Sequence, residues 1–115
     1  RVTRHGTYSP AATRQAERDI CIYWMRAHPR HAGFAREVAL RLEVTVYLPK
    51  PKSVRRDKPS VRPDFDNYVK LICDALNGLA YLDDGQITTN LTRKRYVREG
   101  ESARIEIVLE EDTEE

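Results

Sequence analysis

One stretch of the chain alternates between apolar and polar positions with the period of two that is typical of a β-strand with one buried face. Its aliphatic members are Val38, Leu40, Leu42, Val44, Val46 and Leu48. Charged and polar residues such as Arg41, Glu43 and Thr45 occupy most of the positions between them. The pattern predicts a strand over residues 38–48 that packs one face against the core.

A helical pattern precedes this strand. Ser9 is a good N-cap, and Pro10 is favoured in the first helical turn, where its missing N–H has no cost. Apolar residues then recur at helical spacing and form one stripe: Ala16, Ile20, Tyr23, Trp24 and Ala27. We therefore predict a helix over residues 10–27, ended by His28 and Pro29, whose stripe belongs to the core or to a dimer surface.

Residues 49–63 contain four prolines, which exclude an internal strand and predict an exposed loop. Six basic residues between positions 50 and 62 face only Asp57 as an opposing charge, a local net charge of +5. They are Lys50, Lys52, Arg55, Arg56, Lys58 and Arg62. Such a run attracts a polyanion, although basic runs are also found as solvated loops.

The second half of the chain predicts one helix and two strands. The helix begins near Asp66 and ends near Gly78, and the strands cover residues 86–97 and 103–109, joined by a hairpin over residues 98–102. This order predicts an α+β fold with a small mixed β-sheet packed with two main helices. We expect a single domain over residues 1–109, an acidic C-terminal tail over residues 110–115, and an N-terminal strand that precedes this chain.

The composition is typical of a folded protein, and the charge distribution favours the binding of polyanions. Of 115 residues, 40% are hydrophobic and 33% are charged, and the net charge of +2 combines a basic body with an acidic end. Residues 1–109 carry 20 basic and 13 acidic side chains, a net charge of +7. Because the sequence contains neither a membrane-spanning apolar run nor a signal-like leader, we expect a cytoplasmic protein without a membrane partner.

Acidic residues gather in one short region of this basic chain. Five of the eight aspartates lie between positions 64 and 84: Asp64, Asp66, Asp74, Asp83 and Asp84. Converging carboxylates suit hard divalent cations such as Mg²⁺, which support phosphodiester hydrolysis. Lys70, one turn after Asp66, would place a cation near a scissile phosphate. The turn at Asp83 and Asp84 could return a third carboxylate to the N-terminus of the second helix.

Each acid also has an ordinary structural interpretation. Asp66 is a good helix N-cap, Asp84 followed by Gly85 is a common turn, and Lys70 with Asp74 is a common surface pair. The set taken together, beside a basic loop, indicates metal-dependent chemistry on nucleic acid.

Four motifs in this region resemble the RusA family of Holliday-junction resolvases. The chain reads RPDFDNYVK from Arg62 to Lys70, DALNG from Asp74 to Gly78, and DDGQI from Asp83 to Ile87. These correspond to the family's DxDN helix start, a lysine four residues later, DAL, and DDxQ(I/V). The match is strongest over residues 62–97, and the basic start of the chain is similar to the family's early loop.

The resemblance implies a homodimeric, Mg²⁺-dependent endodeoxyribonuclease that makes paired nicks in four-way DNA junctions, with Mn²⁺ as a substitute and no nucleotide cofactor. It implies Asp64, Asp66 and Asp84 as metal ligands and Lys70 as a catalytic cation. Residues expected around that site are Asn67, Asp74, Asp83 and Gln86. Residues expected to bind DNA are Arg4, Lys50, Lys52, Arg55, Arg56, Lys58, Arg62, Arg93 and Lys94.

Two other functions are compatible with the same residues. A metal-dependent nuclease acting on flaps or single strands would share the acidic site without junction specificity. A non-catalytic nucleic-acid-binding module would use the basic loop without any dependence on a divalent cation.

Overall fold

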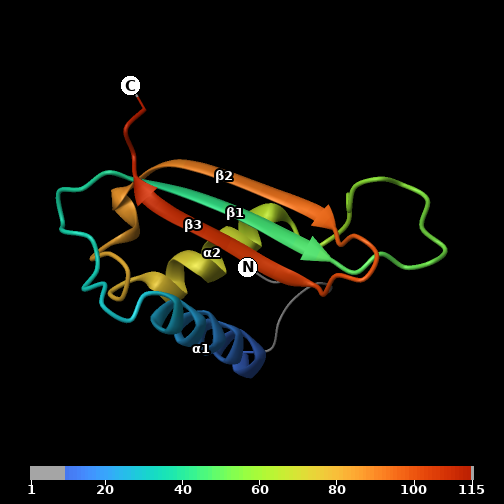
Figure 1. Cartoon of the computed structure of the whole chain (residues 1–115), viewed down its shortest axis with the longest axis horizontal. Coiled ribbons are helices and arrows are strands. Elements are labelled where there is room, and N and C mark those ends of the chain that lie inside the picture. The colour runs from blue at the N-terminus through green and yellow to red at the C-terminus, as the bar shows by residue number, and fades with distance from the viewer. Residues whose placement is uncertain (1–9, 115) are drawn as a thin grey trace.

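Two layers build the molecule, a three-stranded sheet and a pair of helices that cover one of its faces (Figure 1). The computed structural model describes residues 10–114, and side chains from residue 13 onward. The elements are α1 (Pro10–Ala27), β1 (Leu40–Leu48), α2 (Phe65–Leu76), the short 3₁₀ helix η1 (Asp84–Gln86), β2 (Ile87–Tyr96) and β3 (Arg104–Glu111). The predicted α+β class, with two helices and a mixed sheet, is confirmed.

β1 is the central strand of the sheet, whose strand order is β2-β1-β3. It pairs in parallel with β2 and antiparallel with β3. The parallel pairing requires a long connection, and α2 lies within the segment that joins the end of β1 to the start of β2. α2 begins directly after the basic loop over residues 49–63, toward the end of the sheet from which that loop projects (Figure 1).

The alternating pattern of β1 packs the hydrophobic core. Leu40, Leu42 and Val44 are fully buried and belong to one cluster with Ile72 and Leu76 of α2. Full burial of each such side chain stabilises the fold by about 1.5–3 kcal/mol. The core therefore fixes α2 against the middle of the sheet, which determines where the residues at its N-terminus lie.

The predicted hairpin over residues 98–102 is wrong. β2 and β3 are consecutive strands, but β1 lies between them and pairs with both. The backbone N–H of Glu101 does donate to the Arg98 carbonyl, at 3.0 Å, so a tight turn forms as the motif suggests. Strand periodicity indicates that two strands exist, but it does not show which strand each one pairs with.

The first two residues of the acidic C-terminal segment, Glu110 and Glu111, belong to β3. β3 continues to Glu111, two residues beyond the strand expected from the sequence. Asp112 follows it, and its carboxylate accepts hydrogen bonds from the hydroxyls of Thr88 (2.6 Å) and Thr89 (2.7 Å) at the start of β2. Those hydrogen bonds hold the pKa of Asp112 below its ordinary value.

Candidate functional site

The acidic pair lies at the N-terminus of α2. Asp64 is the N-cap residue, with an extended backbone (φ −67°, ψ 154°), and Asp66 lies in the first helical turn. The sequence allowed Asp66 as the cap, but the helix begins one residue before it. Asp64 makes no side-chain capping hydrogen bond, and both aspartates are exposed. Their carboxylates have no hydrogen-bond or ion-pair partner among residues 10–114, so both are available to a ligand.

Both carboxylates line a shallow cavity of about 700 Å³ between α2, β2 and the end of the basic loop. Thr92 and Lys94 of β2 form the opposite wall. The remaining lining residues are Ser60, Val61, Arg62 and Phe65. The cavity combines two acids, two basic residues and an exposed aromatic ring in one open depression.

Lys94 anchors the backbone that leads into the acidic pair. Its ammonium group donates to the carbonyl oxygen of Val61 and, at 2.9 Å, to that of Pro63. Pro63 directly precedes Asp64, so β2 and the N-terminus of α2 are joined at this point. A lysine predicted to bind DNA is therefore already engaged with the protein backbone.

Lys70 lies on the exposed surface of α2, one turn after Asp66. Residues four apart lie on one side of a helix, so Asp66, Lys70 and Asp74 share a face. Among residues 10–114, none of the ion pairs present includes any of these three side chains. The surface pair that the sequence allowed between Lys70 and Asp74 is thus not formed.

Asp84 lies apart from the acidic pair. It belongs to η1, and its charge acts on Cys73 and Tyr81, which pack at the third turn of α2. Burial is the main cause that raises the pKa values of both groups, and Asp84 adds to it. η1 directly precedes Ile87 at the start of β2, whereas the acidic pair lies beside Thr92, five residues or roughly 16 Å further along that strand. The expected return of a third carboxylate to the N-terminus of α2 does not occur within one chain.

Asp83 and Gln86 have structural roles that the motif did not reveal. The Asp83 carboxylate accepts from the backbone N–H of Gly85, at 2.9 Å, as the N-cap of η1. The Gln86 side-chain oxygen accepts from the N–H of Asp83, at 3.1 Å, which completes a capping box. The Gln86 amide also donates to the carbonyls of Ala35 (2.8 Å) and Val38 (3.1 Å). These contacts attach the start of β2 to the segment before β1.

Asn67 and Asp74, also expected near the site, lie at different heights on α2. Asn67 is half-buried in the first turn, and its backbone N–H donates to the Asp64 carbonyl, at 3.1 Å. Asp74 is exposed and lines a second shallow depression with Arg14 and Arg18 of α1. Asn67 is therefore close in space to the acidic pair, whereas Asp74 lies about two turns further along α2, beside α1.

The basic loop projects from one end of the sheet, and all six of its basic residues are exposed (Figure 1). Tyr96, at the end of β2, contacts two of them. The Nε atom of Arg56 donates to the Tyr96 hydroxyl at 3.0 Å, and the Lys50 ammonium lies 5.6 Å from the centre of its ring. The predicted exposure is confirmed, and Tyr96 attaches the loop to the sheet.

One further residue expected to bind DNA, Arg93, has a different environment. Arg93 lies on the sheet face away from the helices and forms an ion pair with Glu43, at 2.7 Å. Glu43 also binds Arg41 at 2.7 Å, and hydrogen bonds from Arg41 and Arg93 lower its pKa. Arg4 lies outside the described residues.

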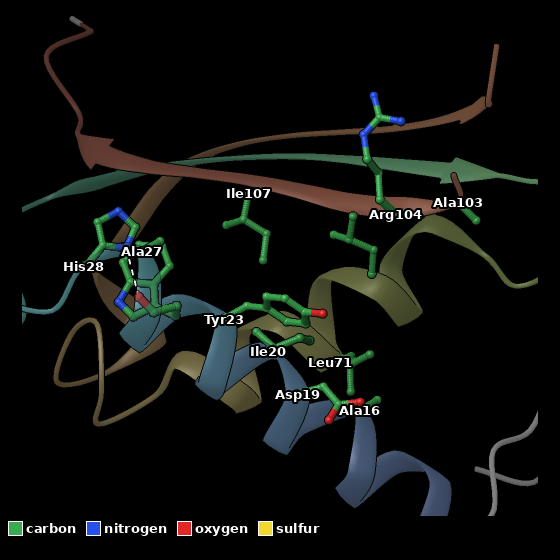
Figure 2. Close-up of a pocket in the computed structure, with 12 residues that line it drawn as sticks. Ala16, Asp19, Ile20, Tyr23, Ala27, His28, Leu71, Ala103, Arg104 and Ile107 are labelled. Atoms are coloured by element: carbon green, nitrogen blue, oxygen red, sulfur yellow. Dashed lines mark hydrogen bonds between the residues drawn. The ribbon is translucent and has the colours of Figure 1, made fainter. Parts of the chain in front are cut away.

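Sequence reasoning missed Thr92 and Tyr96. In a strand, residues two apart share a face, so Thr92, Lys94 and Tyr96 lie on one face of β2. The two-residue period of a strand could have assigned Thr92 and Tyr96 to the same face as Lys94, but only if Lys94 had been known to face α2. A largely apolar pocket of about 570 Å³ between α1, α2 and β3 is separate from this site (Figure 2).

The donor set at the N-terminus of α2 fits a hard divalent cation, and it supplies two carboxylates rather than the three expected from the sequence. Carboxylate oxygens are the ligands that Mg²⁺ prefers, and it commonly uses only one or two from the protein. Within residues 10–114, no three His, Cys, Asp or Glu side chains lie close enough to hold a metal ion.

The same residues include no helix long and apolar enough to cross a membrane.

The fold and the exposed acidic pair agree with a nuclease, and the comparison with known families defines the class: residues 1–110 match the family described as Endodeoxyribonuclease RusA. The match covers nearly the whole chain. The chain belongs to the RusA family, as its motifs predicted.

A curated relative is also similar to this chain. It is "Uncharacterized protein YqaN" of Bacillus subtilis (strain 168), 39% identical over 82 residues. The alignment covers 61% of this chain and 56% of the relative, so the chain spans little more than half of that protein's length.

Proposed function

We propose that the protein is a Holliday-junction resolvase, a cytoplasmic, Mg²⁺-dependent endodeoxyribonuclease that makes paired symmetric nicks in four-way junctions during recombination and repair. The observation that carries the proposal is the pair of carboxylates of Asp64 and Asp66, which have no partner within residues 10–114 and lie beside an exposed basic loop. The family, whose description is that of an endodeoxyribonuclease, supports the reaction type.

Asp64, Asp66 and Asp84 are the proposed ligands of Mg²⁺, for which Mn²⁺ would substitute. The bound ion would activate a water molecule and neutralise charge on the leaving oxygen. Lys70, exposed on the same helix face as Asp66, would bind the phosphate that carries the developing negative charge. Lys50, Lys52, Arg55, Arg56, Lys58 and Arg62 would bind the DNA backbone and hold the strand over the acidic pair.

The position of Asp84 makes a dimer part of the proposal. Because Asp84 lies just before the start of β2, whereas the acidic pair lies beside Thr92 and Lys94 further along that strand, it would complete the pair only if a second copy supplied it. Two-fold symmetry would then create two equivalent sites. A junction also has two-fold symmetry, so such a dimer would cut two opposed strands.

A candidate dimer surface lies along α1 and the outer edge of β3, which pairs with no strand among the described residues. Ile20, Tyr23 and Ile107 point into the apolar pocket between these elements (Figure 2). Tyr23 is 71% exposed, whereas Trp24 of the same predicted stripe is buried. β1 has strand partners at both edges, so neither of its edges is open to a second copy.

One gel tests the proposed function. Synthetic four-way junction, linear duplex, flap and single-stranded DNA are incubated with the protein, with and without Mg²⁺. The proposal expects symmetric nicks in the junction only, and only with Mg²⁺. Cleavage mainly of flaps or single strands would indicate the broader nuclease, and binding without cleavage would indicate a non-catalytic module. Either result would contradict the proposal.

A further inference from the structure

Lys94 is a basic residue beside two carboxylates, yet its side chain binds backbone carbonyl groups. It shares the cavity with Asp64 and Asp66. Its ammonium group nevertheless donates to the carbonyls of Val61 and Pro63, and it forms no ion pair with either aspartate. A lysine this close to two acids would be expected to pair with one of them if charge alone determined its position.

The two carbonyls belong to the segment that determines where Asp64 lies. Among the described residues, no other hydrogen bond joins the backbone of residues 61–63 to the rest of the protein. On the other side of the pair, the Asn67 N–H donates to the Asp64 carbonyl, at 3.1 Å, and begins the helix. Asp64 is thus held between the helix on one side and the Lys94 contact on the other.

We propose that Lys94 is a positioning residue for the acidic pair, which keeps Asp64 and Asp66 in place for a divalent cation. The proposal rests on the metal role given to these aspartates in the proposed function. By occupying carbonyls, Lys94 leaves the carboxylate oxygens available to the cation. Groups that orient metal ligands in this way typically contribute 10- to 100-fold in metal affinity.

The charge of Lys94 and its anchoring role predict opposite effects on cation binding when Lys94 is replaced. A measurement of cation binding therefore distinguishes the two. Loss of a nearby positive charge alone would strengthen cation binding. Loss of the anchor would release the segment before Asp64 and weaken binding. Lys94→Met keeps most of the side-chain volume and removes both the charge and the donors.

The experiment measures Mn²⁺ binding by electron paramagnetic resonance of the free ion, without DNA. We expect Lys94→Met to bind Mn²⁺ roughly 10- to 100-fold more weakly than the wild type. We expect Lys94→Arg, which keeps a charged donor, to recover most of that loss. Arg41→Met is the matched control, because it removes a basic side chain bound at 2.7 Å on the other sheet face. Glu43 keeps Arg93 as its partner in that control.

Unchanged or tighter Mn²⁺ binding by folded Lys94→Met would overturn the proposal, as would an equal loss in Arg41→Met. If Lys94→Met does not fold, Lys94→Gln takes its place, since its shorter neutral side chain cannot reach both carbonyls. Wild-type binding no tighter than that of Asp66→Asn would also overturn it. Cleavage of the junction by the wild type is scored separately. A protein that binds Mn²⁺ in the expected order but cuts no junction retains the positioning role and loses the proposed function.

Discussion

At the scale of single residues, a substitution of Asp66 best separates an effect on cleavage from an effect on the stability of the fold. Its carboxylate is exposed and has no partner among the described residues, so Asp66→Asn should leave the fold intact. We expect junction binding to persist and cleavage to fall by at least about a hundredfold, since a proposed metal ligand is removed. Cleavage kinetics and a junction-binding assay, each at ordinary Mg²⁺, measure the two effects.

Asp83→Asn is the matched control for that variant. The Asp83 carboxylate accepts from the Gly85 N–H, and an asparagine oxygen accepts the same hydrogen bond. We expect a mild effect on cleavage, whereas Asp64→Asn and Asp84→Asn should resemble Asp66→Asn. Full activity of Asp66→Asn, or its unfolding, would contradict the assignment.

The lowered pKa of Glu43 predicts that its contribution to the stability of the fold depends on pH. Hydrogen bonds from Arg41 and then Arg93 hold its pKa below the ordinary glutamate value. Such a group stabilises the fold above its unfolded-state pKa, and the contribution is lost as pH falls through the folded-state pKa. Glu43→Gln should therefore be less stable than the wild type at pH 7, with a smaller difference below about pH 4. Urea unfolding at both pH values tests this, and an equal difference at both would contradict it.

At the scale of elements, the basic loop predicts a change in salt dependence. Arg55 and Arg56 are exposed, and removing one phosphate-binding side chain should reduce the slope of log affinity against log salt by about one. We expect Arg55→Ala with Arg56→Ala to bind a junction more weakly and with a shallower slope. Fluorescence anisotropy over a salt series measures both quantities.

The control for the loop variant removes the same charge at another place. Arg30 and Arg36 are exposed in the segment between α1 and β1, at the opposite end of the sheet from the basic loop (Figure 1). Arg30→Ala with Arg36→Ala should leave the slope near the wild-type value. Equal slopes for both double variants would mean that the basic loop is only a solvated connection.

Local patterns predicted the elements well, because each element carries its own periodicity. The alternation in β1 and the spacing in α2 gave boundaries within a few residues of those observed. Pairing was not predictable in the same way, since β2 and β3 are adjacent in sequence but are separated by β1 in space. The acidic pair was found from its one-residue spacing at a helix start. The position of Asp84 was not, because it depends on how η1 packs against α2.

At the scale of the whole molecule, the position of Asp84 predicts complementation between inactive variants. Asp66→Asn and Asp84→Asn should each be inactive alone. In a mixed dimer, one site would combine the intact Asp64 and Asp66 of one copy with the intact Asp84 of the other. We expect mixed subunits to regain nicking of one strand. Absence of activity after verified subunit exchange would show that Asp84 does not act across a dimer.

Paired cleavage by a two-fold symmetric protein can be followed on a supercoiled plasmid that extrudes a cruciform. Two nicks on opposed strands within one binding event convert the plasmid to a linear product, whereas independent single nicks give relaxed circles. With Mg²⁺ we expect linear product to appear at the earliest times, before nicked circles accumulate. A time course that yields only nicked circles, or a plasmid left uncut, would contradict paired cleavage.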